Sequence, residues 1–166
     1  MRTWDDAAGV VEFPDGRSVR ASGVLTNQYA WKVRGELPGA RPAELPAPQF
    51  AVYLLGRRPA PTAWPARWVR WPDFRTPADT ADALDALRDA HRRAATERVE
   101  IACGSGIGRT GTALAVLAIL SGVAPAEAVA WVRAHHHRRA VETPGQRRWL
   151  RRPEVVSLYS PAQGAP

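Results

Sequence analysis

The stretch Cys103-Gly104-Ser105-Gly106-Ile107-Gly108-Arg109-Thr110-Gly111 lies between two segments of different character. Before it, Arg98 to Ala102 is short and rich in β-prone residues, which predicts a strand. After it, Thr112 to Leu120 is apolar on every side, which predicts a helix buried in the middle of a domain. The sequence therefore predicts a strand, a glycine-rich turn and a helix N-terminus, an arrangement that binds anions.

Three kinds of anion site could use this turn. Gly106 to Gly111 fits the G-x-G-x-x-G pattern of dinucleotide-binding folds, but such a fold needs a second strand ending in an acid about 20 residues on. The next segment here, Pro125 to His136, has a helical pattern instead. A Walker A loop requires glycine and lysine where this chain has Cys103 and Arg109. The third kind of site is a Cys-x5-Arg loop.

A Cys-x5-Arg loop places a thiol at the bottom of a cup of backbone N–H groups, which can bind a phosphate dianion. The helix N-terminus adds partial positive charge, and the guanidinium of Arg109 can bond two phosphate oxygens at once. The same field favours thiolate over thiol, so we expect Cys103 to be an ionised nucleophile. The structural alternative is a buried cysteine beside a glycine-rich turn, because free cysteine is often buried.

Two further motifs accompany this loop. Trp71-Pro72-Asp73-Phe74 precedes it, with Asp73 standing 30 residues before Cys103, and Val141-Glu142-Thr143-Pro144-Gly145-Gln146 follows it. Together the three motifs resemble the protein tyrosine phosphatase superfamily, in which a cysteine phosphate loop is joined by a mobile Trp-Pro-Asp loop and a glutamine loop. The resemblance spans residues 71 to 146. It implies an α/β fold of that family's type, a sandwich with a small mixed central sheet flanked by helices.

The resemblance also implies a role for each motif residue. Cys103 attacks phosphorus to form a cysteinyl-phosphate, Arg109 holds the phosphate oxygens, and Asp73 protonates the leaving oxygen. Asp73 then acts as base toward a water that Gln146 positions, while the hydroxyl of Thr110 stabilises the departing thiolate. No metal or other cofactor is implied, because the loop amides and Arg109 supply the charge stabilisation. The phosphate-binding amides would be those of Gly104, Ser105, Gly106, Ile107 and Gly108.

Several of these residues also have structural interpretations. Asp73 could be a turn residue, and Thr143 with Gln146 forms a capping box that needs no catalytic explanation. His135-His136-His137 cannot share one metal ion, because adjacent helical residues point in different directions, and we expect surface histidines. The family usually has histidine immediately before the cysteine, whereas this chain has Ala102, which removes one hydrogen-bonding support of the loop.

The rest of the chain predicts short strands and helices in one domain over residues 1–166. Motif-free strands and Pro-rich loops fill 1–65, the catalytic part covers 66–152, and a tail occupies 153–166. The expected strands are a hairpin of Val10–Phe13 with Ser18–Ala21, then Phe50–Leu55 and Arg67–Trp71. The expected helices run from Pro77, capped by Thr76, to about Ala95, from Pro125 to about His136, and from Pro144 onward.

Composition restricts the partners. Hydrophobic residues are 45% of the chain, as in folded proteins. The longest uncharged stretch, Thr110 to Ala126, has 17 residues and is interrupted by glycine and proline, so we expect no membrane insertion. No secretory signal is visible, which predicts a cytoplasmic protein.

The net charge is +7, and Trp131 to Arg152 holds seven arginines against Glu142 alone. Nucleic acid is a partner that this charge allows but does not favour.

The expected substrate is a phosphate monoester, with protein phosphotyrosine the leading candidate, and the loop should also accept a phosphate or sulfate ion. The shortness of the chain favours the dual-specificity or atypical branch. Two alternatives stay open. One is a phosphatase of phosphoinositides or RNA 5′-phosphates, and the other is a non-catalytic module that binds phosphate or nucleic acid through the same loop. The intact set of Cys103, Arg109 and Asp73 favours the enzyme.

Overall fold

A five-stranded sheet forms the centre of the computed structural model, which describes residues 3–4, 9–24 and 46–161. The strand order is β1-β2-β5-β3-β4, with β1 antiparallel to β2 and the other neighbouring pairs parallel. The predicted mixed α/β sheet is therefore confirmed. The strands are β1 (Val10–Glu12), β2 (Ser18–Gly23), β3 (Phe50–Leu55), β4 (Ala66–Arg70) and β5 (Val99–Cys103).

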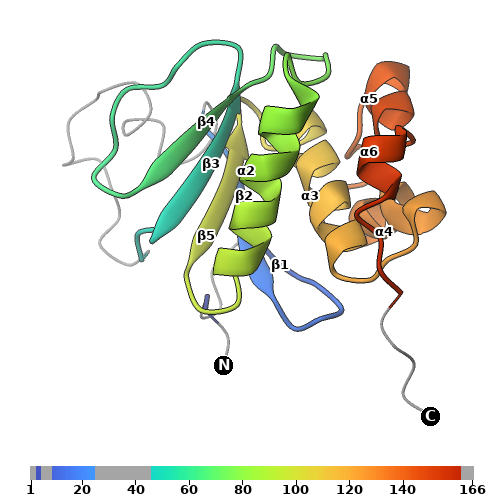
Figure 1. The fold of residues 1–166 in the computed structure, drawn as a ribbon. Coiled ribbons are helices and arrows are strands. Elements are labelled where there is room, and N and C mark those ends of the chain that lie inside the picture. The colour runs from blue at the N-terminus through green and yellow to red at the C-terminus, as the bar shows by residue number, and fades with distance from the viewer. Residues whose placement is uncertain (1–2, 5–8, 25–45, 162–166) are drawn as a thin grey trace.

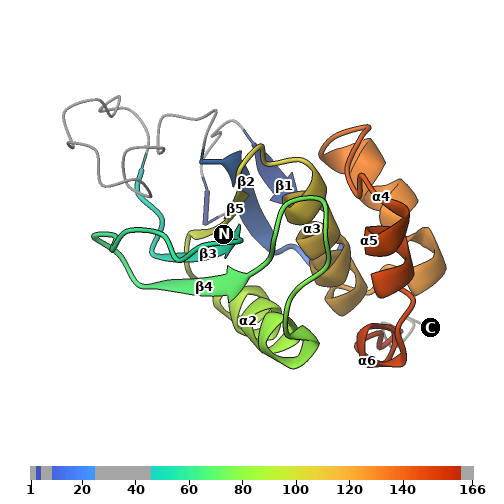
Figure 2. The same cartoon turned by 90° about the horizontal axis from the view of Figure 1, so that it is seen from above.

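The helices lie mainly on one side of this sheet (Figures 1 and 2). α2 and α3 pack against the strands, and α4, α5 and α6 lie beyond α3. Within the described ranges, no helix is both long and apolar enough to cross a bilayer. The helical segments are α2 (Thr80–Arg93), α3 (Gly108–Leu120), the 3-10 turn η2 (Pro125–Glu127), α4 (Ala128–His135), α5 (Pro144–Trp149) and α6 (Pro153–Val156).

The core places β5 and α3 at the middle of the molecule. Every residue of β5 is buried between β2 and β3, and α3 is buried from Gly108 to Ile119. The prediction of a short strand followed by a buried helix is thus confirmed, and the structure places this strand at the centre of the sheet. The turn between them is consequently held at both ends by the most buried elements of the fold.

Two segments differ from the sequence predictions: the start of α2 and the segment after residue 152. α2 begins at Thr80 rather than Pro77, because the Ala78 N–H donates to the Arg70 carbonyl at 2.9 Å and the backbone of Asp79 is extended. Asp79 is the actual N-cap, and its carboxylate accepts the Asp82 N–H at 3.0 Å. The segment after residue 152 was expected to be a tail, but it forms α6, and its apolar side chains Val155 and Leu158 cover the core. Part of the predicted Pro-rich loops, residues 25–45, lies outside the described residues.

Gly111 marks the closest approach of α3 to the segment that leads into α5. A Cβ at this position would lie 2.6 Å from the Ala140 Cβ and 2.9 Å from its Cα. Helix propensity favours alanine over glycine by about 1 kcal/mol, but overpacking costs about 1–3 kcal/mol. We therefore expect Gly111→Ala to lower the free energy of unfolding, measured by denaturant titration. Gly145→Ala, where the nearest atom would be the Thr143 Oγ1 at 3.8 Å, is the matched control and should not lower the free energy of unfolding.

Candidate active site

The turn between β5 and α3 is built around Cys103. The thiol is 1% exposed, and its Sγ accepts the Gly106 N–H at 3.2 Å. Gly106 has a φ of +78°, a conformation that favours glycine, and a Cβ there would lie 2.8 Å from the Gly23 nitrogen of β2. Ile107, the N-cap of α3, provides no side-chain cap. The first N–H groups of α3 therefore have no capping side chain, and an anion could satisfy them.

Arg109, in the first turn of α3, connects this turn to the Trp-Pro-Asp motif. Its Nη1 donates to the Trp71 carbonyl at 3.0 Å, and its Nη2 lies 3.2 Å from Asp73 Oδ1. The guanidinium is nearly buried, and its Nε has no hydrogen-bond partner among the described residues. Figure 2 shows the segment after β4 running beside the start of α3. The fold thus brings Arg109 and Asp73 together, and Arg109 lies in the first turn of the helix that follows the Cys103 turn.

The Trp-Pro-Asp segment is fixed at its tryptophan and exposed at its acid. Trp71 is fully buried, donates its indole N–H to the Arg75 carbonyl at 2.6 Å, and packs at a tilt on Trp149, 5.4 Å between ring centroids. The Asp73 side chain is 61% exposed, and its Oδ1 accepts the Phe74 N–H at 3.0 Å. Phe74 has a φ of 59°, which is rare for a non-glycine residue, and its ring is 63% exposed.

Gln146 is completely buried and joins two segments of the site. Its Oε1 accepts the N–H groups of Glu142 and Thr143 at 2.9 and 3.3 Å, and its backbone N–H donates to Thr143 Oγ1 at 3.1 Å. The predicted capping box is confirmed. Its Nε2 also donates to the Arg75 carbonyl at 3.2 Å, so Gln146 ties α5 to the loop that carries Asp73.

Thr110 and Glu142 complete the surroundings of the loop. The hydroxyl of Thr110 is buried and has no hydrogen-bond partner in the part of the chain that the structure describes. In contrast, the hydroxyl of Thr112 donates to the Gly108 carbonyl at 2.8 Å. A Cβ at Gly108 would lie 2.8 Å from Glu142 Oε2, so this carboxylate lies against the start of α3. No sequence pattern predicted this position of Glu142.

The three consecutive histidines have three different environments. His135 stacks on the Trp131 ring at 4.2 Å, and the Nδ1 of His137 accepts the Arg139 N–H at 3.0 Å. His136 is half-buried, with its Nε2 2.8 Å from the Gly106 carbonyl oxygen. The prediction of three surface histidines is therefore wrong for His136, whose position depends on how α4 packs beside the loop. Within the ranges that the structure describes, no group of three or more potential metal-ligating side chains occurs.

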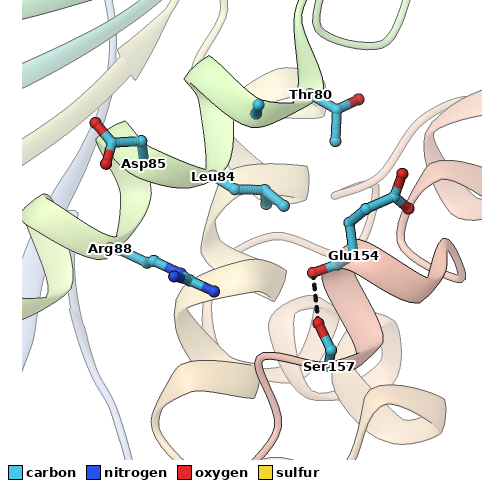
Figure 3. A pocket seen from close by; sticks show the side chains of 7 residues that line it. Thr80, Leu84, Asp85, Arg88, Glu154 and Ser157 are labelled. Carbon is cyan, nitrogen blue, oxygen red and sulfur yellow. Dashed lines mark hydrogen bonds between the residues drawn. The ribbon is translucent and has the colours of Figure 1, made fainter.

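A cavity elsewhere in the molecule does not coincide with these residues. It has a volume of about 500 Å³ and lies between α2 and α6 (Figure 3). None of the motif side chains lines this cavity, which therefore lies apart from the candidate active site. The cavity is lined by Thr80, Ala81, Leu84, Asp85, Arg88, Glu154 and Ser157.

Comparison with known families identifies the chain. The family model described as protein-tyrosine phosphatase matches residues 50–144, more than half of the sequence, and includes Cys103, Arg109 and Asp73. The chain belongs to the protein-tyrosine phosphatase family. It is accordingly a phosphatase that acts on phosphate esters. Gln146 lies just beyond the matched residues of this protein-tyrosine phosphatase.

Two solved structures of Tk-PTP have a fold similar to that of this chain. The crystal structure titled Tk-PTP in the active form is 27% identical, covers 66% of this chain and 78% of its own, and has a TM-score of 0.56. The G95A mutant form of Tk-PTP has the same identity, coverage of this chain and TM-score, with 77% of its own chain covered. PTPMT1 is 16% identical over 66% of this chain and 76% of its own, with a TM-score of 0.46. No curated protein sequence matches this protein-tyrosine phosphatase significantly.

Proposed function

We propose that the protein hydrolyses phosphotyrosine in proteins through a cysteinyl-phosphate intermediate. Cys103 is the nucleophile, Arg109 binds the phosphate, and Asp73 is the general acid. The observation that carries this assignment is the position of the Arg109 guanidinium, which contacts Asp73 at 3.2 Å and keeps a buried Nε without a partner among the described residues. The Arg109 guanidinium thereby connects Asp73 to the phosphate loop.

Arg109 can act as a two-bond phosphate ligand. Its Nη1 is held by the Trp71 carbonyl, which orients the guanidinium plane. The remaining edge, Nε and Nη2, is a planar fork that can bond two oxygens of a dianion. Because Asp73 Oδ1 lies 3.2 Å from Nη2, this edge already accommodates one negative oxygen. A substrate phosphate would take this place, with Asp73 moving toward the leaving group.

The first chemical step forms the S–P bond and breaks the P–O bond to the alcohol. The thiolate of Cys103 is stabilised by the Gly106 N–H, which lies 3.2 Å from Sγ, and by the N-terminus of α3. The backbone N–H groups of residues 104–108 and Arg109 stabilise the charge on the transferred phosphoryl group. Asp73 donates its proton to the leaving oxygen. No electron transfer occurs, and the phosphoryl group stays on Cys103.

The second step releases inorganic phosphate. Water attacks phosphorus, the S–P bond breaks, and Asp73 accepts the proton of that water. Gln146, which is bound to the same loop as Asp73 through the Arg75 carbonyl, positions the water. The departing thiolate of Cys103 is stabilised by the hydroxyl of Thr110, whose lack of another partner among the described residues supports this role.

Phosphotyrosine is favoured as substrate by the surface beside the acid. The ring of Phe74, 63% exposed, directly follows Asp73 and can pack on an aryl leaving group. The same proposal includes dual specificity toward other phosphorylated residues, binding of a phosphate or sulfate ion in the loop, and a cytoplasmic location.

The basic C-terminal part supports a second candidate function. Arg148, Arg151 and Arg152 are exposed, which favours a polyanionic substrate such as a phosphoinositide or RNA 5′-phosphate.

A substrate panel tests the proposal. Phosphotyrosine and phosphoserine peptides, a phosphoinositide and 5′-phosphorylated RNA are compared by kcat/KM in the presence of EDTA. We expect the phosphotyrosine peptide to give the highest value and EDTA to have no effect, because the protein groups supply the charge stabilisation. A higher value for phosphoinositide or RNA would support the second candidate instead. Binding that weakens steeply with salt, without turnover of any substrate, would indicate a nucleic-acid-binding module.

A further inference from the structure

His136 contacts the phosphate loop from outside. It is the C-cap residue of α4, where its backbone N–H donates to the Val132 carbonyl at 2.8 Å, and its ring is half-buried. Its Nε2 lies 2.8 Å from the Gly106 carbonyl oxygen. Because a carbonyl oxygen only accepts hydrogen bonds, Nε2 carries the hydrogen and donates it.

The imidazole stays in this donor form near neutral pH. Burial lowers the pKa of His136 below its ordinary value of 6.5, and the nearby charge of His137 acts in the same direction, while the bond to Gly106 opposes both effects. The neutral ring with its hydrogen on Nε2 makes the contact, and an imidazolium would keep the same N–H. The hydrogen bond is therefore independent of the protonation of Nδ1.

This contact fixes the direction of one peptide group in the loop. In a trans peptide the C=O and the N–H point in opposite directions. The carbonyl of Gly106 is directed outward to α4, so the N–H of the same peptide, which belongs to Ile107, points to the other side of the loop. There it lies 3.4 Å from the Ser105 Oγ, a long hydrogen bond that a phosphate oxygen could replace.

Gly106 is the residue of this loop at which such a restraint has the largest effect. Glycine has more backbone freedom than any other residue, so the peptide groups on both sides of it rotate easily. The preceding peptide is held by its N–H on Cys103 Sγ. The following peptide is held by His136. The residue before Cys103, Ala102, has only a methyl side chain and cannot provide a hydrogen bond to the loop.

We propose that His136 is a positioning residue for the phosphate loop, holding the Gly106 carbonyl so that the Ile107 N–H is presented to the bound phosphate. The proposal rests on the function of the loop proposed above. His136 does not touch the substrate, and its effect is transmitted through one peptide group.

Substitutions that separate the hydrogen bond from the packing test this role. His136→Leu fills the space without a donor, whereas His136→Gln offers an amide N–H at similar reach. We expect the leucine variant to raise the inhibition constant of inorganic phosphate about tenfold and to lower kcat/KM roughly 10- to 100-fold, as for loss of one donor to a developing charge. The glutamine variant should recover most of both losses. His137→Leu, which changes the adjacent ring, should leave both values unchanged.

Unchanged phosphate inhibition in His136→Leu would overturn the proposal. The proposal would also be overturned if the leucine and glutamine variants lost phosphate affinity and kcat/KM equally, in proportion to a lowered melting temperature. His136 would then serve packing alone. If His136→Leu does not fold, His136→Ala is assayed with and without added imidazole, and recovery by imidazole supports the role while its absence contradicts it. Phosphate binding is measured by calorimetry in parallel. If the wild-type protein shows no turnover, the proposed function is contradicted, but phosphate binding by the His136 variants still tests the role of His136.

Discussion

Cys103→Ser is expected to lose turnover by a factor on the order of 10³ or more, since removal of a nucleophile from a comparable covalent mechanism has an even larger effect. A serine hydroxyl is not ionised at neutral pH and is a weak nucleophile without an adjacent general base. Inorganic phosphate should still bind, because the backbone N–H groups and Arg109 are unchanged. The measurements are single-turnover kinetics with an aryl phosphate and calorimetric titration with phosphate.

The outcome of this substitution separates two interpretations of the loop. Retention of more than about 1% of activity would contradict the assignment of Cys103 as nucleophile. Loss of both turnover and phosphate binding would point to a collapsed loop. A suitable control is Ser157→Ala, which removes an exposed hydroxyl at the end of α6, outside the phosphate loop, and leaves the thiol in place. It should retain most of the activity.

Asp73→Asn is expected to lower kcat/KM for a phosphotyrosine peptide by roughly 10²- to 10⁴-fold, the usual contribution of general acid catalysis. In the wild-type enzyme, the dependence of kcat/KM on pH should be bell-shaped, because the mechanism needs a deprotonated nucleophile and a protonated acid at the same time. The variant should lose the alkaline limb. The loss in rate should be much smaller for a nitrophenyl phosphate, whose leaving group needs less protonation. Binding of the peptide should survive, because the proton is needed mainly in the transition state.

Asp85→Asn provides the control for Asp73→Asn. Its carboxylate lies on α2, is 74% exposed on its side chain and pairs with Arg67 at 2.6 Å. Surface ion pairs contribute about 0–1 kcal/mol, so this change should affect neither the rate nor the pH profile. If Asp73→Asn behaves in the same way, the Trp-Pro-Asp segment is only a turn and the acid lies elsewhere.

Local sequence pattern predicted much of this molecule. The alternation and turn residues gave β1, β2, β3 and β5 to within one or two residues, and β-prone residues followed by Pro72 gave β4. Thr143 and Gln146 predicted the capping box of α5, because that motif uses contacts only three residues apart. The motif order predicted that Asp73 belongs to the site of Arg109, and the two side chains lie 3.2 Å apart in the fold.

Features that depend on contacts distant in sequence were not predicted. The buried Arg20 of β2 donates from its Nε to Glu100 of β5 at 2.8 Å, across 80 residues. No sequence pattern around either residue predicts this pairing, because arginine and glutamate side chains are usually exposed. The contact of His136 with Gly106 spans 30 residues and requires the packing of α4 against the loop. The start of α2 was misplaced because Thr76 and Asp79 are both good capping residues, and tertiary hydrogen bonding selects between them.

The most direct test of the central claim is detection of the covalent intermediate. The wild-type enzyme is mixed with an aryl phosphate, quenched within one turnover, and digested for mass spectrometry. We expect one added phosphoryl group on the peptide that contains Cys103, present in wild-type enzyme, enriched when Gln146→Ala slows the second step, and absent in Cys103→Ser. A rapid turnover of substrate with no phosphoryl group on Cys103, or with the group on another residue, would contradict the account.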